Sequence, residues 1–228
     1  MADNQKSTAN SARTLDSSYV NHATMLPYGL KVAQVAEGVA ETYRLYDGIN
    51  RFLASSGFRP LEELLLGNSL SGLVSELLVK NIARVSTTLI ANRKVGGHPD
   101  LLPKDEYPDG SVLKTTDGIE VKTSQRRGGW QGHNPEDCWV MVFRYRVGAQ
   151  RDKNTVPVTF TEILCAKLLK KDWSFSGRKG ASRRTPTASI TSSGVEKLRT
   201  SFLYRIPGVG VGRHLTILVG SADPVSAG

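Results

Sequence analysis

Residues 98–125, HPDLLPKDEYPDGSVLKTTDGIEVKTSQ, alternate short apolar segments with turn-forming residues. Pro108-Asp109-Gly110 and Asp117-Gly118 are typical of tight turns, because these residue types accept the backbone angles that turns require. The segments around these turns are short, and short segments separated by turn residues are typical of strands. The sequence therefore predicts three strands, over His98–Leu102, Ser111–Thr115 and Ile119–Thr123.

The last of these predicted strands carries Glu120 and Lys122, two residues apart. Alternate side chains of a strand point to the same face, so these two should lie side by side. Asp100 lies on or just after the first strand, and pairing with a neighbouring strand can bring it to Glu120. Two carboxylates can hold a hard divalent cation through oxygen ligands. A lysine beside them can position water and stabilise charge in a transition state, which together suits phosphodiester hydrolysis.

Two alternatives stay open from the residues alone. Glu120 and Lys122 could form a solvated strand face opposite a buried Val121. Asp109, which also follows a proline, rivals Asp100 as the second carboxylate, although it lies on a turn only 11 residues before Glu120. The other nearby acidic residues suit structural or solvated roles: Asp105, Glu106 and Asp117.

The chain before this segment has helical periodicity. Apolar residues recur at helical spacing over 27–53 and again from Ser69 to about Asn92, which predicts two helices. Gly38 and Gly48 could divide the first one, and a short helical turn follows Pro60.

The chain after this segment mixes strands with basic polar stretches. Trp139–Arg146 alternates as a strand does, with Trp139, Met141, Phe143 and Tyr145 on one face. Val156–Cys165 predicts a further strand, although Glu162–Lys171 could instead be a helix. A long loop is expected over 174–193, then a helix over 194–202 and a strand over 215–219. Helices followed by clustered strands predict an α/β or α+β fold.

Composition limits the class of protein. The chain contains no run of about 18 apolar residues, so we expect no membrane-spanning segment. The N-terminus lacks an apolar secretory segment. We therefore expect a cytoplasmic protein with reduced, partly buried Cys138 and Cys165. A zinc site is not expected, because His98 and His133 belong to no metal-binding motif.

The net charge of +9 is unevenly distributed. Residues 1–120 contain 12 Lys and Arg against 14 Asp and Glu, whereas residues 121–228 contain 18 against 7. A basic half beside a nearly neutral one indicates a surface for a polyanion such as nucleic acid.

The motif Pro99-Asp100 followed by Glu120-Val121-Lys122 resembles that of the PD-(D/E)XK nuclease superfamily, over about Ser69 to Arg146. Within it, the chain looks most like a type II restriction endonuclease. The resemblance implies a restriction-endonuclease-like mixed central sheet flanked by helices, and cleavage leaving a 5′-phosphate and a 3′-hydroxyl. It also implies one or two Mg²⁺ ions per site, with Asp100, Glu120 and the Val121 carbonyl as ligands and Lys122 as the catalytic lysine. Glu76, on the preceding helix, is an additional candidate ligand.

This reading divides the chain into a flexible tail (1–24), an N-terminal helical region (25–68), a nuclease core (69–220) with a basic DNA-contact segment (174–193), and a frayed C-terminus (221–228). Basic and amide side chains bind backbone phosphates and base edges. The predicted DNA-binding residues are Arg126, Arg127, Gln131, His133, Asn134, Arg178, Lys179, Arg183 and Arg184.

The function expected from these features is Mg²⁺-dependent, sequence-specific cleavage of double-stranded DNA by a homodimer. A repair or junction-resolving nuclease would use the same site. A DNA-binding protein that keeps a nuclease-like fold without catalysis is the less favoured alternative.

Overall fold

The computed structural model describes residues 13–107, 109–132, 134–148, 158–175 and 187–209 of the chain. Its centre is a mixed six-stranded sheet with the order β1-β2-β3-β5-β6-β9, and a small three-stranded sheet has the order β4-β8-β7. In the large sheet, β3 and β5 pair in parallel and all other neighbours are antiparallel. The predicted α/β class, with an N-terminal helical region, is confirmed.

The elements have the following bounds. The helices are α1 (Val32–Ser55), α2 (Leu61–Leu64), α3 (Gly67–Val85) and α4 (Ser192–Thr200). The strands are β1 (Leu89–Ala91), β2 (Leu101–Pro103), β3 (Ile119–Ser124), β4 (Gln131–Gly132), β5 (Cys138–Val147), β6 (Val158–Leu168), β7 (Trp173–Phe175), β8 (Ala188–Ile190) and β9 (Phe202–Arg205).

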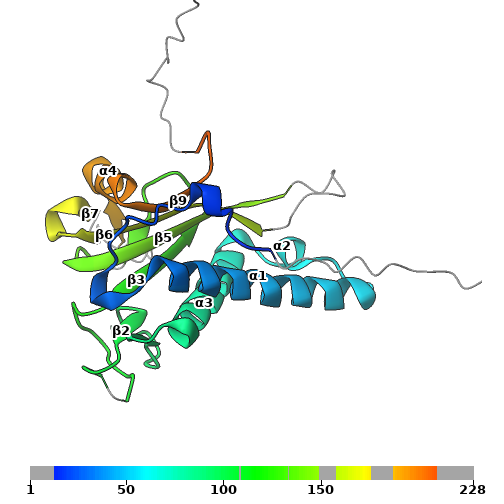
Figure 1. Cartoon of the computed structure of the whole chain (residues 1–228), viewed down its shortest axis with the longest axis horizontal. Coiled ribbons are helices and arrows are strands. Elements are labelled where there is room, and N and C mark those ends of the chain that lie inside the picture. The colour runs from blue at the N-terminus through cyan, green and yellow to red at the C-terminus, as the bar shows by residue number, and fades with distance from the viewer. Residues whose placement is uncertain (1–12, 108, 133, 149–157, 176–186, 210–228) are drawn as a thin grey trace, which may run out of the picture.

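The large sheet is buried on both faces, which makes a layered molecule (Figure 1). On one face, α1 and α3 pack against Met141, Phe143 and Tyr145 of β5. On the other face, α4 and the small sheet pack against Val140 and Val142. The predicted alternation of β5 is therefore confirmed, and its buried faces show why the strand is almost continuously apolar.

Helix α1 is unbroken, so the expectation that Gly38 or Gly48 divides it is wrong. Gly38 faces α3, and a Cβ atom there would lie 2.7 Å from Cγ1 of Ile82. The glycine allows close helix packing, and the packing outweighs its low helix propensity. Among the described helices, none is long and apolar enough to cross a membrane.

Other expected boundaries are corrected. The second helix ends at Val85 instead of about Asn92, because residues 89–91 pair with β2 as strand β1. Residues 111–115 form no strand and make one isolated bridge, between His98 and Lys114. Strand β6 continues to Leu168, so the alternative helix over 162–171 is wrong, apart from a single 3-10 turn at Lys170–Asp172.

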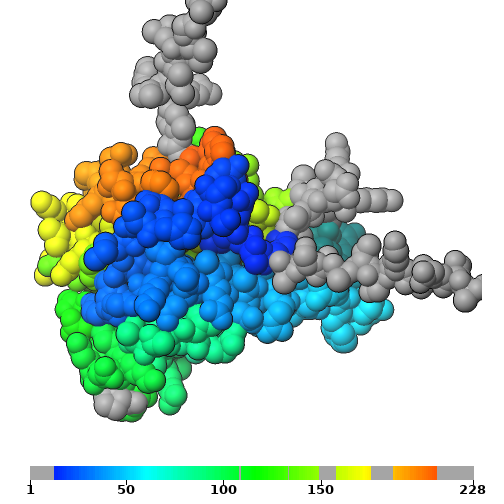
Figure 2. All heavy atoms as spheres, in the orientation of Figure 1, coloured from blue at the N-terminus to red at the C-terminus, as the bar shows by residue number. Residues whose placement is uncertain are grey.

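The predicted loop over 174–193 includes β7, β8 and the start of α4; its residues 176–186, like 215–219 and 221–228, lie outside the described part. Residues 13–24, which were expected to belong to a flexible tail, are ordered. Arg13 pairs with Asp47 of α1, and Leu15 is buried. Asn21 donates to the Leu203 carbonyl of β9, and Figure 2 shows this N-terminal segment (dark blue) lying against the C-terminal one (orange). The segment is ordered because it packs against an edge of the core.

Candidate active site

Asp100, Glu120 and Lys122 lie where β2 and β3 meet. The two strands pair antiparallel with Leu101 opposite Ile119, so Asp100 is set beside the start of β3. Its Oδ2 accepts a hydrogen bond of 2.8 Å from the Val121 amide. The Lys122 ammonium lies 2.5 Å from Oε1 of Glu120 on the same strand face. The predicted convergence of these three residues is therefore present.

The turn into β3 brings the two strands close together. Gly118 has a φ of 135°, and a Cβ atom there would lie 2.2 Å from the Leu101 carbonyl oxygen. Only glycine fits this backbone and this gap. The Gly118 amide donates to the Tyr28 hydroxyl at 2.8 Å, and the Asn92 amide donates to the Asp100 carbonyl at 2.8 Å. These contacts hold the backbone at Asp100 and at the turn into β3, and the Val121–Asp100 hydrogen bond joins the two strands.

Three further charged side chains extend the site from Glu120. Nδ1 of His98 lies 2.8 Å from Oε2 of Glu120, and Nε2 lies 2.6 Å from Oε2 of Glu136. The second contact is a close ion pair without the alignment of a hydrogen bond. The Lys114 ammonium lies 2.7 Å from the other oxygen of Glu136. Charges therefore alternate along Lys122, Glu120, His98, Glu136 and Lys114.

The two carboxyl groups of the motif have opposite pKa shifts. Burial, followed by the charge of Glu120, raises the pKa of Asp100 to about 7. Burial would also raise the pKa of Glu120, but hydrogen bonding to His98 and the charges of Lys122 and His98 outweigh it and lower that pKa to about 2. Close carboxyl groups cannot both ionise readily without a cation, so near neutral pH the metal-free site keeps its negative charge mainly on Glu120.

The cationic side chains around Glu120 stay protonated. Burial lowers the pKa of His98, but hydrogen bonds to Cys138 and Glu120 and the charges of Glu120 and Glu136 raise it to about 10. Burial likewise opposes the charge of Lys122, but the charge of Glu120 prevails and raises the pKa of the lysine. Both therefore compensate the negative charge of Glu120 at neutral pH.

Two pockets open on either side of Lys122. The first has a volume of about 320 Å³ and is lined by His98, Lys114, Glu120, Glu136 and Cys138, among others. The second has a volume of about 510 Å³ and lies between the start of α3 and the residues that follow β3. Lys122 lines both pockets.

The structure discriminates among the carboxylates that the sequence left open. Asp109 is exposed on its turn and lines neither pocket, so it does not compete with Asp100. Glu76 is exposed on α3 and also lines neither pocket. The structure therefore does not bring Glu76 to Asp100 and Glu120. Within the described ranges, Glu76 also forms no ion pair with Lys80.

The predicted DNA-binding residues fall into two groups. Arg126, Arg127, Gln131 and Asn134 are exposed. Arg126 and Gln131 line the second pocket, whereas Asn134 lines the first. The remaining ones lie outside the described residues: His133, Arg178, Lys179, Arg183 and Arg184.

The structure adds Glu136, Lys114 and His98 to the site, none of which the sequence singled out for it. Glu136 precedes β5, which pairs in parallel with β3, so its place beside the motif depends on a strand pairing distant in sequence. His98, two residues before Asp100, was the available signal. Cys138 and Cys165 are free and buried, as expected.

The donor set suits a hard cation in part. Two adjacent carboxyl groups, one with a raised pKa, are crowded like charges that a divalent cation would relieve. The Val121 carbonyl is the further ligand that the motif implies. Within the described residues, however, no group of three or more His, Cys, Asp or Glu could hold a metal ion. A cation here would have to displace part of the contacts that Lys122 and His98 make with Glu120.

No protein-family model matches the chain, and no curated protein matches it.

Proposed function

We propose that this protein is a Mg²⁺-dependent endonuclease that hydrolyses phosphodiester bonds of double-stranded DNA, with a site of the PD-(D/E)XK type and the specificity of a type II restriction enzyme. The observation that carries the proposal is the meeting of Asp100, Glu120 and Lys122 at the β2–β3 junction, beside a pocket. A solvated strand face would not bury these groups: the side chains of Glu120 and Lys122 are only 13% and 20% exposed.

Each residue has a distinct role in this proposal. Asp100 and Glu120, with the Val121 carbonyl, would hold the cation, which would neutralise the phosphate and activate water. Lys122 orients the nucleophilic water and stabilises the charge that develops on the phosphate. Its raised pKa argues against a role as a general base, because the ammonium form dominates at neutral pH.

The surroundings of the site support a polyanionic substrate. Lys122 lies between the two pockets, and the exposed Arg126 and Arg127 follow directly after the catalytic strand. Phosphates of a bound strand could therefore contact cationic side chains on one side of the proposed scissile bond. We propose the cytoplasm as the site of action, where DNA would be accessible.

A homodimer would provide two centres, one for each DNA strand. Helix α1 already buries Val35, Val39 and Tyr43 within its own chain, so that face is used to cover the sheet. Large apolar side chains stay exposed from the far end of α1 to the start of α3: Phe52 (69%), Phe58 (62%), Leu64 (50%) and Leu66 (77%). Large apolar side chains that stay exposed in one stretch of the chain support a second copy as a partner for this stretch.

One observation favours a second candidate, a DNA-binding protein without catalysis. Glu120 is already paired with both Lys122 and His98, so its charge is compensated without a metal ion. Such a protein would bind DNA through the same basic side chains and cleave nothing.

Digestion of a supercoiled plasmid with Mg²⁺, followed by sequencing of the ends, tests the proposal. We expect discrete fragments with 5′-phosphates, and no cleavage after chelation of the metal. Cleavage confined to branched substrates would instead indicate a junction-resolving or repair nuclease. Binding without cleavage across a panel of DNA substrates and divalent metals would favour the second candidate.

A further inference from the structure

The second pocket has one wall made by the end of β3 and the chain that follows it. This wall, residues 124–131, contributes Ser124, Gln125, Arg126, Gly129, Trp130 and Gln131. The start of α3 also lines this pocket, at Gly67, Asn68 and Ser71. Among the described residues, the lining contains two cationic side chains, Lys122 and Arg126, and no carboxylate. The first pocket, in contrast, is lined by both Glu120 and Glu136.

We infer that the second pocket is a subsite for a DNA backbone phosphate next to the one that is cleaved, and that a buried network centred on Glu162 holds its 124–131 wall in place. The inference rests on the proposed nuclease function, and it names a subsite and its positioning residues.

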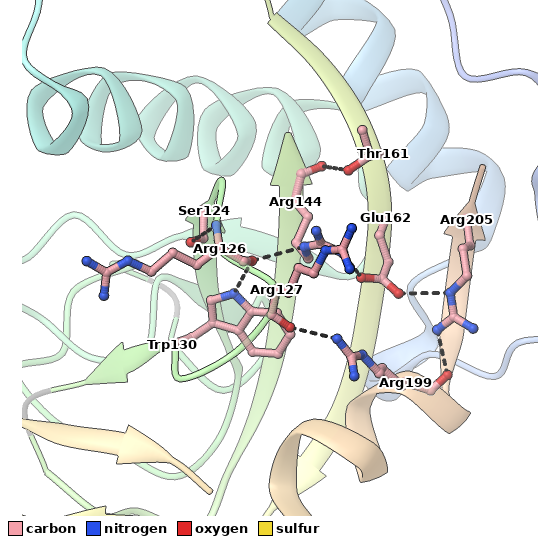
Figure 3. A network of polar contacts seen from close by, with 9 residues as sticks. All are labelled: Ser124, Arg126, Arg127, Trp130, Arg144, Thr161, Glu162, Arg199 and Arg205. Carbon is pink, nitrogen blue, oxygen red and sulfur yellow. Dashed lines mark hydrogen bonds and ion pairs between the residues drawn. The ribbon is translucent and has the colours of Figure 1, made fainter. Parts of the chain in front are cut away.

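The network fixes the wall through two backbone carbonyl groups (Figure 3). The Arg126 carbonyl accepts hydrogen bonds from Nε of Arg144 at 3.0 Å and from the Trp130 indole at 3.2 Å. The Arg127 carbonyl accepts one of 2.8 Å from Nη2 of Arg199. Since Trp130 is only 3% exposed, it anchors the wall from within.

Glu162 connects the arginines of this network. Its side chain is fully buried on β6, where Oε2 accepts from Nη1 of Arg144 at 2.6 Å and Oε1 accepts from Nε of Arg205 at 2.8 Å. Arg205 in turn donates to the Arg199 carbonyl at 2.8 Å. Strands β5, β6 and β9 and helix α4 thus support one wall of the pocket. A buried carboxylate needs such paired cations, because desolvation would otherwise disfavour its charge.

This arrangement has an electrostatic consequence at the pocket. The carbonyl groups of Arg126 and Arg127 accept hydrogen bonds from Trp130, Arg144 and Arg199. Their partial negative charges are therefore neutralised by these donors and repel an incoming phosphate less. The Arg126 side chain points away from the network (Figure 3). Within the described part of the chain, no carboxylate pairs with the Arg126 guanidinium, which lines the pocket. The wall is therefore preorganised for an anion, since this cation is free to bind phosphate.

The experiment measures affinity of the full chain for a short labelled duplex of mixed sequence without divalent metal, as a function of salt. Three variants form a cycle: the wall variant Arg126→Gln, the network variant Arg199→Gln, and their combination. Arg199 is replaced rather than Glu162, because a substitution of the fully buried Glu162 would disturb the fold itself. Arg199→Lys is the conservative variant. Lys80→Gln, which removes an exposed charge on α3, is the matched control.

We expect the wall variant to lose about tenfold in affinity and to flatten the salt dependence. Arg199→Gln should lose about threefold to tenfold with an unchanged unfolding temperature, Arg199→Lys should recover most of this, and Lys80→Gln should stay within about twofold. Because Arg199 acts through the wall, the combined variant should bind about as well as the wall variant alone.

If the affinity losses of the wall variant and of Arg199→Gln add in the combined variant, the positioning role of Arg199 is overturned. The same holds if Arg199→Gln binds DNA as well as the control Lys80→Gln does. A wild-type chain that binds no DNA, or a wall variant that binds like the wild type, would overturn the subsite itself. Wild-type protein that binds DNA but fails to cleave it with any divalent metal would contradict the proposed nuclease activity alone.

Discussion

The Lys122 ammonium lies 2.5 Å from a carboxylate oxygen of Glu120, two residues earlier on strand β3. The amide between them, that of Val121, donates to Asp100. A single extended segment thus holds a lysine and a carboxylate on one face and binds a second carboxylate by its backbone. In this arrangement the lysine position is fixed by the acidic group that would bind the metal ion.

Replacement of Lys122 should separate cleavage from binding. Lys122→Met keeps the aliphatic stem but removes the charge that we propose stabilises the transition state, so we expect cleavage to fall by about 100-fold or more. DNA affinity should fall only severalfold, because other cations contribute to it. Plasmid cleavage and duplex binding measured on the same preparation check this, with Lys80→Met as the control. Residual cleavage near the wild-type rate would exclude a catalytic role for this lysine.

Mg²⁺ binding should depend on pH with a defined sign. The pKa of Asp100 is raised to about 7, so below that pH the metal must displace a proton from Asp100. Affinity should therefore rise from pH 6 to pH 8, and binding should release protons. Calorimetry in two buffers of different ionisation enthalpy measures that release. An affinity that does not change with pH would mean that Asp100 is not a ligand.

The metal-free protein should gain stability from Asp100→Asn at high pH. A raised pKa disfavours the charged form in the fold, so the wild type loses stability as pH rises from about 3.8, the ordinary value, through about 7. Asparagine keeps an oxygen for the Val121 amide but carries no charge. We expect the variant to unfold at a temperature several degrees higher than the wild type at pH 8, and the difference to shrink at pH 5. A difference that is constant across this range would contradict the crowding of the two carboxyl groups.

The exposed apolar side chains near the end of α1 predict the oligomeric state. Phe52→Asp combined with Phe58→Asp should convert a dimer into a monomer, because each places a charge in an apolar contact. Light scattering coupled to size exclusion measures this, with the exposed Lys80→Asp as the control. A wild-type chain that is monomeric alone and on DNA would contradict the proposed homodimer.

The sequence was informative where local patterns determine structure. The alternation of β5 and the ExK spacing of β3 follow from the two-residue period of a strand, so both could be predicted. The ends of helices and the continuity of α1 could not, because the contact between Gly38 and Ile82 joins residues distant in the chain.

Charged residues inside the core were harder to predict. The sequence predicts a strand up to Cys165 but leaves a helix from Glu162 open as an alternative, and the partners of Glu162, Arg144 and Arg205, belong to other strands. Glu136 joins the site for a similar reason, through the pairing of β3 with β5. Such contacts depend on the assembled sheet rather than on any local pattern.

Binding of Mn²⁺, as a spectroscopic substitute for Mg²⁺, tests most directly whether Asp100 and Glu120 share one divalent cation. Electron paramagnetic resonance of the metal-titrated protein should detect specific Mn²⁺ binding in the wild type. Asp100→Asn and Glu120→Gln should each weaken that binding by about tenfold or more, while Asp109→Asn should leave it unchanged. Equal Mn²⁺ affinity in the wild type and in both site variants would contradict the shared cation and, with it, the proposed catalytic centre.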